Sequence, residues 1–212
     1  MPMKTVFHFV VVLCCLSLVV ACGKDVYHFP DASREFFTAY TASDSTIQAI
    51  ELDNGAYFKV IENTSNRKGT PDSVYRFIGY YEVLDEGVKL YSANRTVSSL
   101  PVPLAEIDSL CTDPLDMVSI WKSGRFLNMR LALKHGNGEH EFGFAEDSIR
   151  QMKGQNHLWF SFQHFADGDM EAFTDFVYAS IPLKAYLEKY KKFTLHFSLN
   201  THEGMKQYDF DF

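Results

Sequence analysis

Cysteine is scarce in this 212-residue sequence, and its placement excludes a fold held together by disulfides. The four cysteines are Cys14, Cys15, Cys22 and Cys111, and three of them lie in or directly after an apolar N-terminal segment. If the first two leave with a cleaved leader and Cys22 is modified, Cys111 has no partner for an intramolecular disulfide. We interpret Cys111 as a small buried residue, since its sequence neighbours offer no basic group to activate a thiol.

The motifs of the common catalytic classes are also missing. There is no G-x-S-x-G turn for a serine nucleophile and no glycine-rich loop for a phosphate group. The histidines show neither HExxH nor H-x-x-x-H spacing, so the paired helix ligands of a zinc hydrolase are absent. Carboxylates are abundant, but a sequence alone cannot pair them at glycosidase distances. We therefore expect no enzyme and no cofactor, with a hydrolase of unrecognised site as an alternative.

Basic residues are fewer than acidic residues in this chain. The chain has 20 Lys and Arg against 27 Asp and Glu, which gives a net charge of −7. An acidic surface repels phosphate backbones, so we expect no nucleic-acid partner. The 19 Phe and 11 Tyr favour strands and can fill a core, which excludes a disordered stalk.

No apolar run is long enough to span a membrane, but a shorter run ends on the most informative residue of the chain. The run over 9–21 falls short of the roughly 20 residues that a spanning helix needs. It follows the positive charge of Lys4 and closes with Val19-Val20-Ala21-Cys22. This is the layout of a lipoprotein signal peptide, cleaved between Ala21 and Cys22 and lipidated on Cys22.

A lipid on Cys22 predicts a membrane partner and a location. One acyl chain holds a protein only marginally, whereas two or three chains, such as palmitate, anchor it stably. Gly23 rather than Asp follows the cysteine, so we expect the outer membrane. Lys24-Asp25 is only a fragment of an acidic export tag, and it leaves open whether the protein faces the periplasm or the outside.

Alternation of apolar and polar residues predicts strands separated by turns in the first half. The turn Asp53-Asn54-Gly55 is a strong hairpin signal, because Asn-Gly accepts the positive φ of tight hairpin turns. The strands expected here are 47–52, 57–61, 74–84 and 88–91, with a polar loop over 63–72. The proline-bearing stretch 101–116, with one helical turn over 104–110, is expected to connect two domains.

The second half shows the same pattern with longer strands. Leu158, Phe160 and Phe162 alternate with polar residues, which predicts one buried and one solvated face. Evenly spaced strands with turn signals suggest a β-sandwich. The strands expected are 118–121, 126–133, 141–144, 158–165, 173–181, 193–199 and 207–212, with one short helix over 185–190.

Four markers in the second half carry a resemblance to a known family. The first is Trp121 with Gly124 and the run 126–129, and the others are 162–164 with Gly168-Asp169, 178–183, and 200–204. With these markers the chain resembles the NigD-like lipoproteins of Bacteroidota. It departs from that pattern at Gln163, where an arginine is expected beside the histidine, so any salt bridge of that arginine is missing here.

The resemblance implies an all-β fold with an N-terminal OB-like barrel and a C-terminal antiparallel β-sandwich. It implies no enzymatic role, and we expect a binding or assembly role with an envelope protein partner or a glycan. The domains expected are a signal peptide over 1–21, the lipidated Cys and a tether over 22–43, the OB-like domain over 44–108, and the sandwich over 109–212.

An OB-like half raises a second hypothesis, an oligosaccharide-binding module at the cell surface. Barrels of this kind often bind oligosaccharides or nucleic acids on one sheet face. Tyr75, Phe77, Tyr80 and Tyr81 could stack on sugar rings, although residues of this type are more often core in so aromatic a chain.

An acidic turn is the one candidate metal site. Asp167, Asp169 and Glu171 surround Gly168 and could offer oxygen ligands to Ca²⁺, but a full calcium loop needs more oxygens and Asp-Gly is an ordinary turn. We therefore expect no metal.

Three histidines have sequence neighbours that suggest contacts. His135 and His140 straddle a hairpin turn and could face each other, although exposed turn histidines are the simpler expectation. His164 lies beside the acidic turn and is expected to hydrogen-bond locally.

Overall fold

The computed structural model describes residues 30–212, and strands account for most of them. The predicted cleavage and lipidation residues, Ala21 and Cys22, lie outside the described residues. From residue 30 onward, no helix has the length and apolar character needed to cross a membrane. The all-β class expected from the sequence is confirmed.

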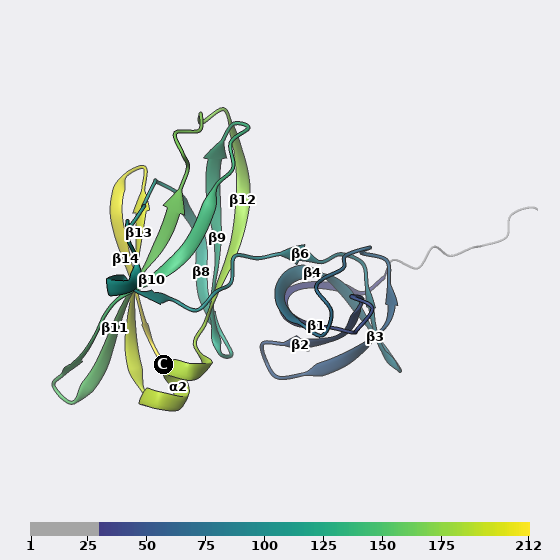
Figure 1. Cartoon of the computed structure of the whole chain (residues 1–212). Coiled ribbons are helices and arrows are strands. Elements are labelled where there is room, and N and C mark those ends of the chain that lie inside the picture. Colours follow the sequence, from purple (N-terminus) through teal and green to yellow (C-terminus); the bar gives the residue numbers. More distant parts are fainter. Residues whose placement is uncertain (1–29) are drawn as a thin grey trace, which may run out of the picture. The chain divides into compact units, whose positions relative to one another are not determined.

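The N-terminal strands close into a five-stranded barrel (Figure 1). They follow the order β1-β2-β3-β5-β4, and β4 returns to pair with β1. Only β3 and β5 pair in parallel among these five, and this order confirms the OB-like barrel. The bounds are β1 Ala32–Thr41, β2 Ile47–Leu52, β3 Tyr57–Asn63, β4 Val74–Leu84 and β5 Gly87–Leu90, with a short β6 Asn94–Arg95 beside β4.

The C-terminal half forms two sheets packed around one apolar core. The larger sheet has the order β14-β13-β11-β10-β7 and the smaller the order β12-β9-β8. The core between them is built from alternate residues of each strand, including Phe160, Phe197 and Leu131. The bounds are β7 Val102–Pro103, η1 Leu104–Glu106, β8 Asp116–Ser123, β9 Phe126–His135, β10 Glu141–Met152, β11 Gln155–Phe165, β12 Phe173–Pro182, α2 Lys184–Tyr190, β13 Phe193–Thr201 and β14 Gly204–Asp211.

The tether expected over 22–43 is wrong from Ala32 onward, because Ala32–Thr41 is β1. Phe36 and Phe37 are adjacent and both buried, so the strand shows no alternation of apolar and polar residues. Phe37 fills the barrel core, whereas Phe36 packs against Trp121 of β8. A strand covered on both faces does not carry the period-2 pattern of a half-exposed strand.

Two further segments differ from expectation. β10 runs to Met152 instead of ending at residue 144, because its second part is polar and half-exposed and gives no apolar signal. β7 pairs with β10, so the larger sandwich sheet takes in residues ahead of the boundary expected at 108/109.

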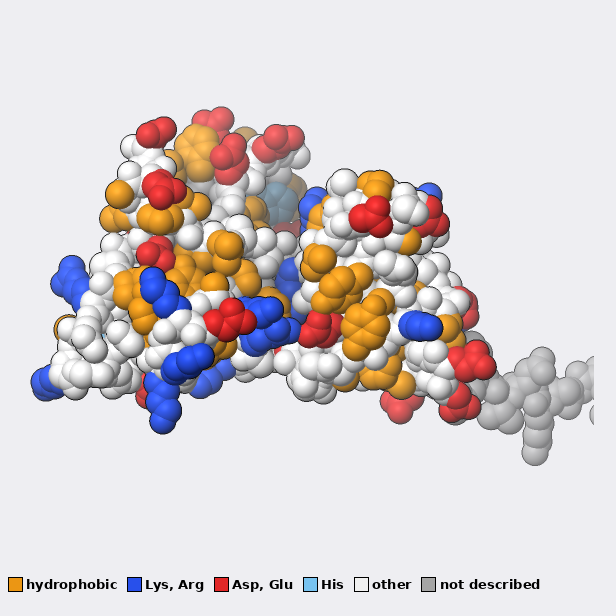
Figure 2. All heavy atoms as spheres, turned by 60° about the horizontal axis from the view of Figure 1, so that its bottom comes forward, with side chains coloured by type: hydrophobic (Ala, Val, Ile, Leu, Met, Phe, Trp, Pro, Cys, Tyr) orange, Lys and Arg blue, Asp and Glu red, His pale blue; other side chains and the backbone are white. Residues whose placement is uncertain are grey.

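Charge is unevenly spread over the surface. Figure 2 shows lysine and arginine side chains gathered over the part of the molecule that carries α2. The sequence of that stretch holds Lys184, Lys189, Lys191 and Lys192. Basic side chains are therefore locally concentrated on a chain whose net charge is −7.

Candidate functional site

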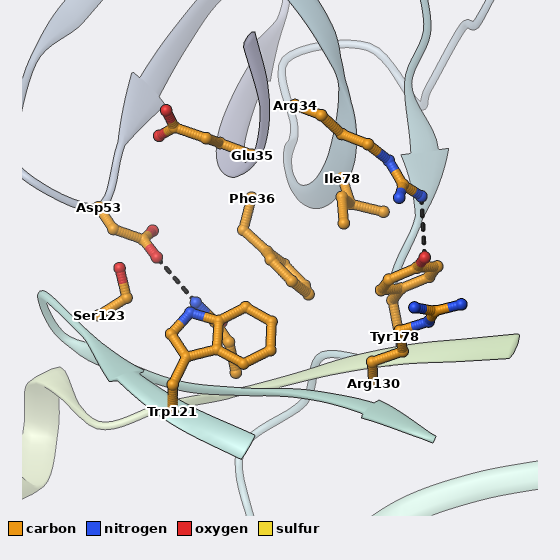
Figure 3. Close-up of a pocket in the computed structure, with 10 residues that line it drawn as sticks. Arg34, Glu35, Phe36, Asp53, Ile78, Trp121, Ser123, Arg130 and Tyr178 are labelled. Carbon is orange, nitrogen blue, oxygen red and sulfur yellow. Dashed lines mark hydrogen bonds between the residues drawn. The ribbon is translucent and has the colours of Figure 1, made fainter. Parts of the chain in front are cut away.

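A pocket lies between the outer surface of the barrel and the outer face of the β12-β9-β8 sheet (Figure 3). Its volume is about 430 Å³, which is within the range of roughly 300–1,000 Å³ typical of ligand sites. It is lined by Arg34, Glu35, Phe36, Asp53, Ile78, Trp121, Ser123, Asn128, Arg130 and Tyr178.

Alternation along β1 and β4 builds the barrel wall of this pocket. Side chains of successive strand residues point to opposite faces, so Phe37 and Phe77 fill the barrel while their neighbours point outward. Arg34 lies opposite Tyr80 and Phe36 opposite Ile78 in the β1–β4 register. The outward face of these two strands therefore carries both a charged and an apolar row.

The register of the smaller sheet builds the pocket floor. Trp121 of β8 lies opposite Asn128 of β9, and Asn128 lies opposite Ser180 of β12. In the next row, Arg130 lies opposite Tyr178. Residues directly opposite in an antiparallel pair share a face, so these side chains all rise from the same side of the sheet.

A buried ion pair joins the barrel to this floor. Arg76 of β4 lies 2.6 Å from Asp53, and their side chains are only 4% and 9% exposed. The Arg76 guanidinium also donates to Ser180 (3.1 Å) and Asn128 (3.2 Å), and the Asn128 amide donates to Asp53 (2.9 Å). Burial lowers the pKa of Arg76, while Asp53 opposes that shift. Each charged group is compensated, as buried charges must be.

The arginines of the pocket have different surroundings. Arg34 donates to the Tyr178 hydroxyl at 2.9 Å, and its guanidinium lies 5.0 Å from the centre of the Tyr178 ring. Arg130 stacks on Phe176 at 3.7 Å, and its Nε is buried without a hydrogen-bond partner.

The neighbouring carboxylates are directed elsewhere. Asp53 is engaged by Arg76 and Asn128. Glu35 follows Arg34 on β1 and points away from Arg34 and Arg130 in Figure 3. Burial, together with the nearby Glu35 carboxylate, raises the pKa of Tyr81 to about 12. Neither of these two carboxylates therefore forms an ion pair with Arg34 or Arg130 within residues 30–212.

The aromatic set proposed to stack on sugars does not form one surface. Phe77 and Tyr81 are buried in the barrel core, which makes that assignment wrong for both. Tyr75 hydrogen-bonds Thr70, and only Tyr80 is well exposed.

Asp169 of the acidic turn is held by backbone and histidine donors. It accepts hydrogen bonds from the Gly136 N–H (2.6 Å) and contacts His140 Nε2 (3.1 Å). The backbone N–H of Gly136, followed by His140, lowers the pKa of Asp169 to about 2. This carboxylate ties the turn after β11 to the β9–β10 hairpin.

The other two carboxylates of the turn do not converge on Asp169. Glu171 pairs with Lys134 (3.3 Å) and His202 (3.4 Å), and Asp167 occupies a turn position with φ of 48°. Across residues 30–212, no group of three or more His, Cys, Asp or Glu side chains has an arrangement that could hold a metal ion.

His140 and His164 form a hydrogen-bonded pair. Their facing ring nitrogens are 2.7 Å apart, and His164 Nδ1 lies 3.0 Å from the Asp113 carbonyl. His164 therefore bonds groups far away in sequence, and the expectation that it bonds the neighbouring acidic turn is wrong. Burial lowers the pKa of His164. His135 and His140 do face each other, with ring centres 6.4 Å apart, but His140 is buried, so exposure was the wrong expectation for it.

Cys111 lines a smaller pocket of about 230 Å³ together with Gln163 and His164. Both ring nitrogens of His164 are occupied, by His140 and by Asp113, so this imidazole is not placed to deprotonate the thiol. This arrangement argues against a Cys111 nucleophile.

Sequence reasoning missed the residues of the main pocket. Arg76 carried a usable signal, since an arginine inside the apolar strand 74–84 must find a partner if its position is buried. Arg34 and Arg130 carried no comparable signal. These two residues come together only through contacts between strands that are far apart in sequence.

Comparison with known proteins agrees with the fold. The model of the NigD-like C-terminal beta sandwich domain matches residues 99–212. No curated protein matches significantly. A crystal structure of a NigD-like immunity protein from Bacteroides caccae ATCC 43185 is 28% identical, with a TM-score of 0.70, covering 88% of this chain and 99% of that one.

Two more distant structures share the fold alone. A protein from Parabacteroides distasonis ATCC 8503, named as toxin-related, is 17% identical with a TM-score of 0.67, covering 86% of this chain and 93% of that one. A protein from Bacteroides fragilis NCTC 9343, named as a lipoprotein, is 11% identical with a TM-score of 0.58, covering 86% and 97%.

Proposed function

Because the chain belongs to the NigD-like family, we propose that it is a lipid-anchored, non-enzymatic protein of the outer membrane that binds a protein partner through the pocket between barrel and sheet. The observation that carries the proposal is the pocket itself. It combines the exposed ring of Trp121 and the half-buried ring of Tyr178 with two arginines, the residue types enriched at protein interfaces. The word "immunity" in the name of the Bacteroides caccae structure also favours a role through partner binding.

The buried ion pair supports the same proposal. A binding surface made from two modules recognises a partner only if the modules hold a fixed geometry. Arg76, Asp53 and Asn128 provide that constraint directly beneath the pocket. A preformed surface binds without the entropic cost of ordering its parts.

Site-specific photo-crosslinking in cells tests the proposed function. A photoreactive amino acid at Val118, exposed on β8, should give a discrete crosslinked species with a protein. The matched control is the same amino acid at Met205, exposed on β14 of the other sheet. Equal products at both positions, or none at Val118, would contradict binding through the pocket face.

Removing Cys22 tests the anchor. The Cys22→Ala chain should lose incorporation of a palmitate analogue and leave the membrane fraction, because no acyl chain can then be attached. Cys15→Ala, in the leader, should keep both properties and is the matched control. Retained label in Cys22→Ala would overturn the lipid anchor. Protease treatment of intact cells then decides whether the protein faces outward.

An oligosaccharide is the second candidate ligand. Trp121 offers a ring that is 37% exposed at the pocket, beside polar groups that could bind hydroxyls. Titration of the full chain with oligosaccharides should then quench tryptophan fluorescence, and Trp121→Leu should remove the response. No response would leave the protein partner as the sole candidate.

A further inference from the structure

Two arginines approach the same tyrosine, one from the barrel and one from the sheet. Arg34 donates to the Tyr178 hydroxyl, and Arg130 is the register partner of Tyr178 on β9. Figure 3 shows both guanidinium groups beside Tyr178. The pocket therefore concentrates positive charge at one place on an acidic chain.

The arginine side chains are held in position by aromatic rings. Arg130 lies flat on Phe176 at 3.7 Å, and Arg34 lies 5.0 Å and 5.5 Å from the Tyr178 and Tyr80 ring centres. Stacking occupies the faces of a guanidinium but leaves its N–H donors free at the edges. Such a fork is preorganised for bidentate contact with a carboxylate or phosphate.

A donor in this arrangement lacks an acceptor. Nε of Arg130 is buried and has no hydrogen-bond partner among residues 30–212, and buried N–H groups without acceptors are rare. The two carboxylates that line the pocket are engaged by other groups, because Asp53 pairs with Arg76 and Glu35 interacts with Tyr81. Residues 30–212 therefore supply no acceptor for this donor.

We infer that the pocket receives the carboxylate of an aspartate or glutamate in an acidic segment of the protein partner, bound between Arg34 and Arg130. This inference rests on the proposed function and specifies the chemistry of the partner. Apolar residues beside that carboxylate would pack on Phe176 and Val118, which are exposed on the same small sheet. A peptide side chain fits a cavity of about 430 Å³.

Hexaglutamate and hexaglutamine are the probes for a titration of the full chain in detergent. Hexaglutamate should bind, more weakly as salt is raised, and hexaglutamine should not, because only the former carries carboxylates. Arg34→Gln should weaken binding by about tenfold, since it removes a charge-assisted contact. Arg34 is exposed, so its replacement leaves the fold intact. Arg130→Gln should have a similar effect.

Arg150→Gln is the matched control. Arg150 also stacks on an aromatic ring, Trp159 at 5.6 Å, but lies outside the pocket, so its replacement should leave hexaglutamate binding unchanged. The inference is overturned if hexaglutamine binds equally well, or if Arg34→Gln and Arg150→Gln behave alike. It is also overturned if inorganic phosphate, vesicles of phosphatidylglycerol or a neutral oligosaccharide compete at lower concentration than hexaglutamate.

Crosslinking separates failure of this inference from failure of the proposed function. If the Val118 product persists in the Arg34→Gln, Arg130→Gln chain, a partner binds without its carboxylate being needed, and only the inference fails. If that product disappears while the Arg150→Gln chain keeps it, the proposed function and the carboxylate inference are both supported. If no product forms in the unmodified chain, the proposed function fails, whatever the titration shows.

Discussion

Asp53→Ala should lower the free energy of unfolding by about 3–5 kcal/mol, because it leaves the buried Arg76 guanidinium without its counter-charge. Asp53 accepts from both Arg76 and Asn128, so the substitution also removes a hydrogen-bond acceptor from the network. Urea unfolding of the full chain, followed by tryptophan fluorescence, measures the loss as a shift of the midpoint.

The exposed pair of Arg125 and Glu51 is the control for this prediction. Its atoms lie 2.7 Å apart, close to the distance in the buried pair, but Arg125 is 46% exposed. Arg125→Ala should therefore cost no more than about 1 kcal/mol. The double variant Asp53→Ala, Arg76→Ala should lose less than the sum of its single changes, since neither charge then remains unpaired. Equal losses for the buried and the exposed pair would contradict this account.

Gly124→Ala should destabilise the protein by about 4 kcal/mol, from the combined costs of backbone strain and overpacking. Gly124 has φ of +53°, and a Cβ at this position would lie 2.0 Å from the Asp53 carbonyl oxygen. The atom that this Cβ would meet belongs to the backbone of Asp53. The clash can therefore be relieved only by moving the β8–β9 turn away from the barrel. The substitution should therefore also weaken binding at the pocket. Thermal unfolding and the hexaglutamate titration measure the two effects.

Gly154→Ala isolates the contribution of the clash. Gly154 in the β10–β11 turn also has positive φ, +82°, but a Cβ there would meet nothing within 4 Å. Its replacement should cost only about 1 kcal/mol, the strain of the left-handed conformation. If the two glycine variants lost the same stability, steric contact with Asp53 would not be the reason for glycine at 124.

Much of the fold could be predicted because most strands are half-exposed. The strand expected over 74–84 matches β4, and the hairpin at Asp53-Asn54-Gly55 joins β2 to β3 as expected. β1 could not be found in this way, since Phe36 and Phe37 are buried on opposite faces and erase the alternation. The closure of the barrel depends on β1, so it could be expected only from the family resemblance.

The candidate site was beyond prediction for a related reason. Arg34, Asp53, Arg130 and Tyr178 lie on four different strands and turns, and no sequence spacing relates them. The carboxylates at 167–171 were identified as a candidate site because they cluster in sequence. Such clusters are common in turns, where Asp and Gly are favoured residues. Asp169 joins the turn after β11 to the β9–β10 hairpin through Gly136 and His140.

The double pairing of β1 has a mechanical consequence. If the chain is tethered through Cys22, a pull on the membrane anchor reaches the first strand, β1, at Ala32. From there β1 runs antiparallel to β4 over nine register pairs, from Ala32 opposite Glu82 to Tyr40 opposite Val74. A pull along the strand axis loads these hydrogen bonds together, in shear, instead of breaking them one at a time. The β1–β4 pairing would then carry the load, and the pocket wall that includes Arg34 and Phe36 of β1 would depend on it.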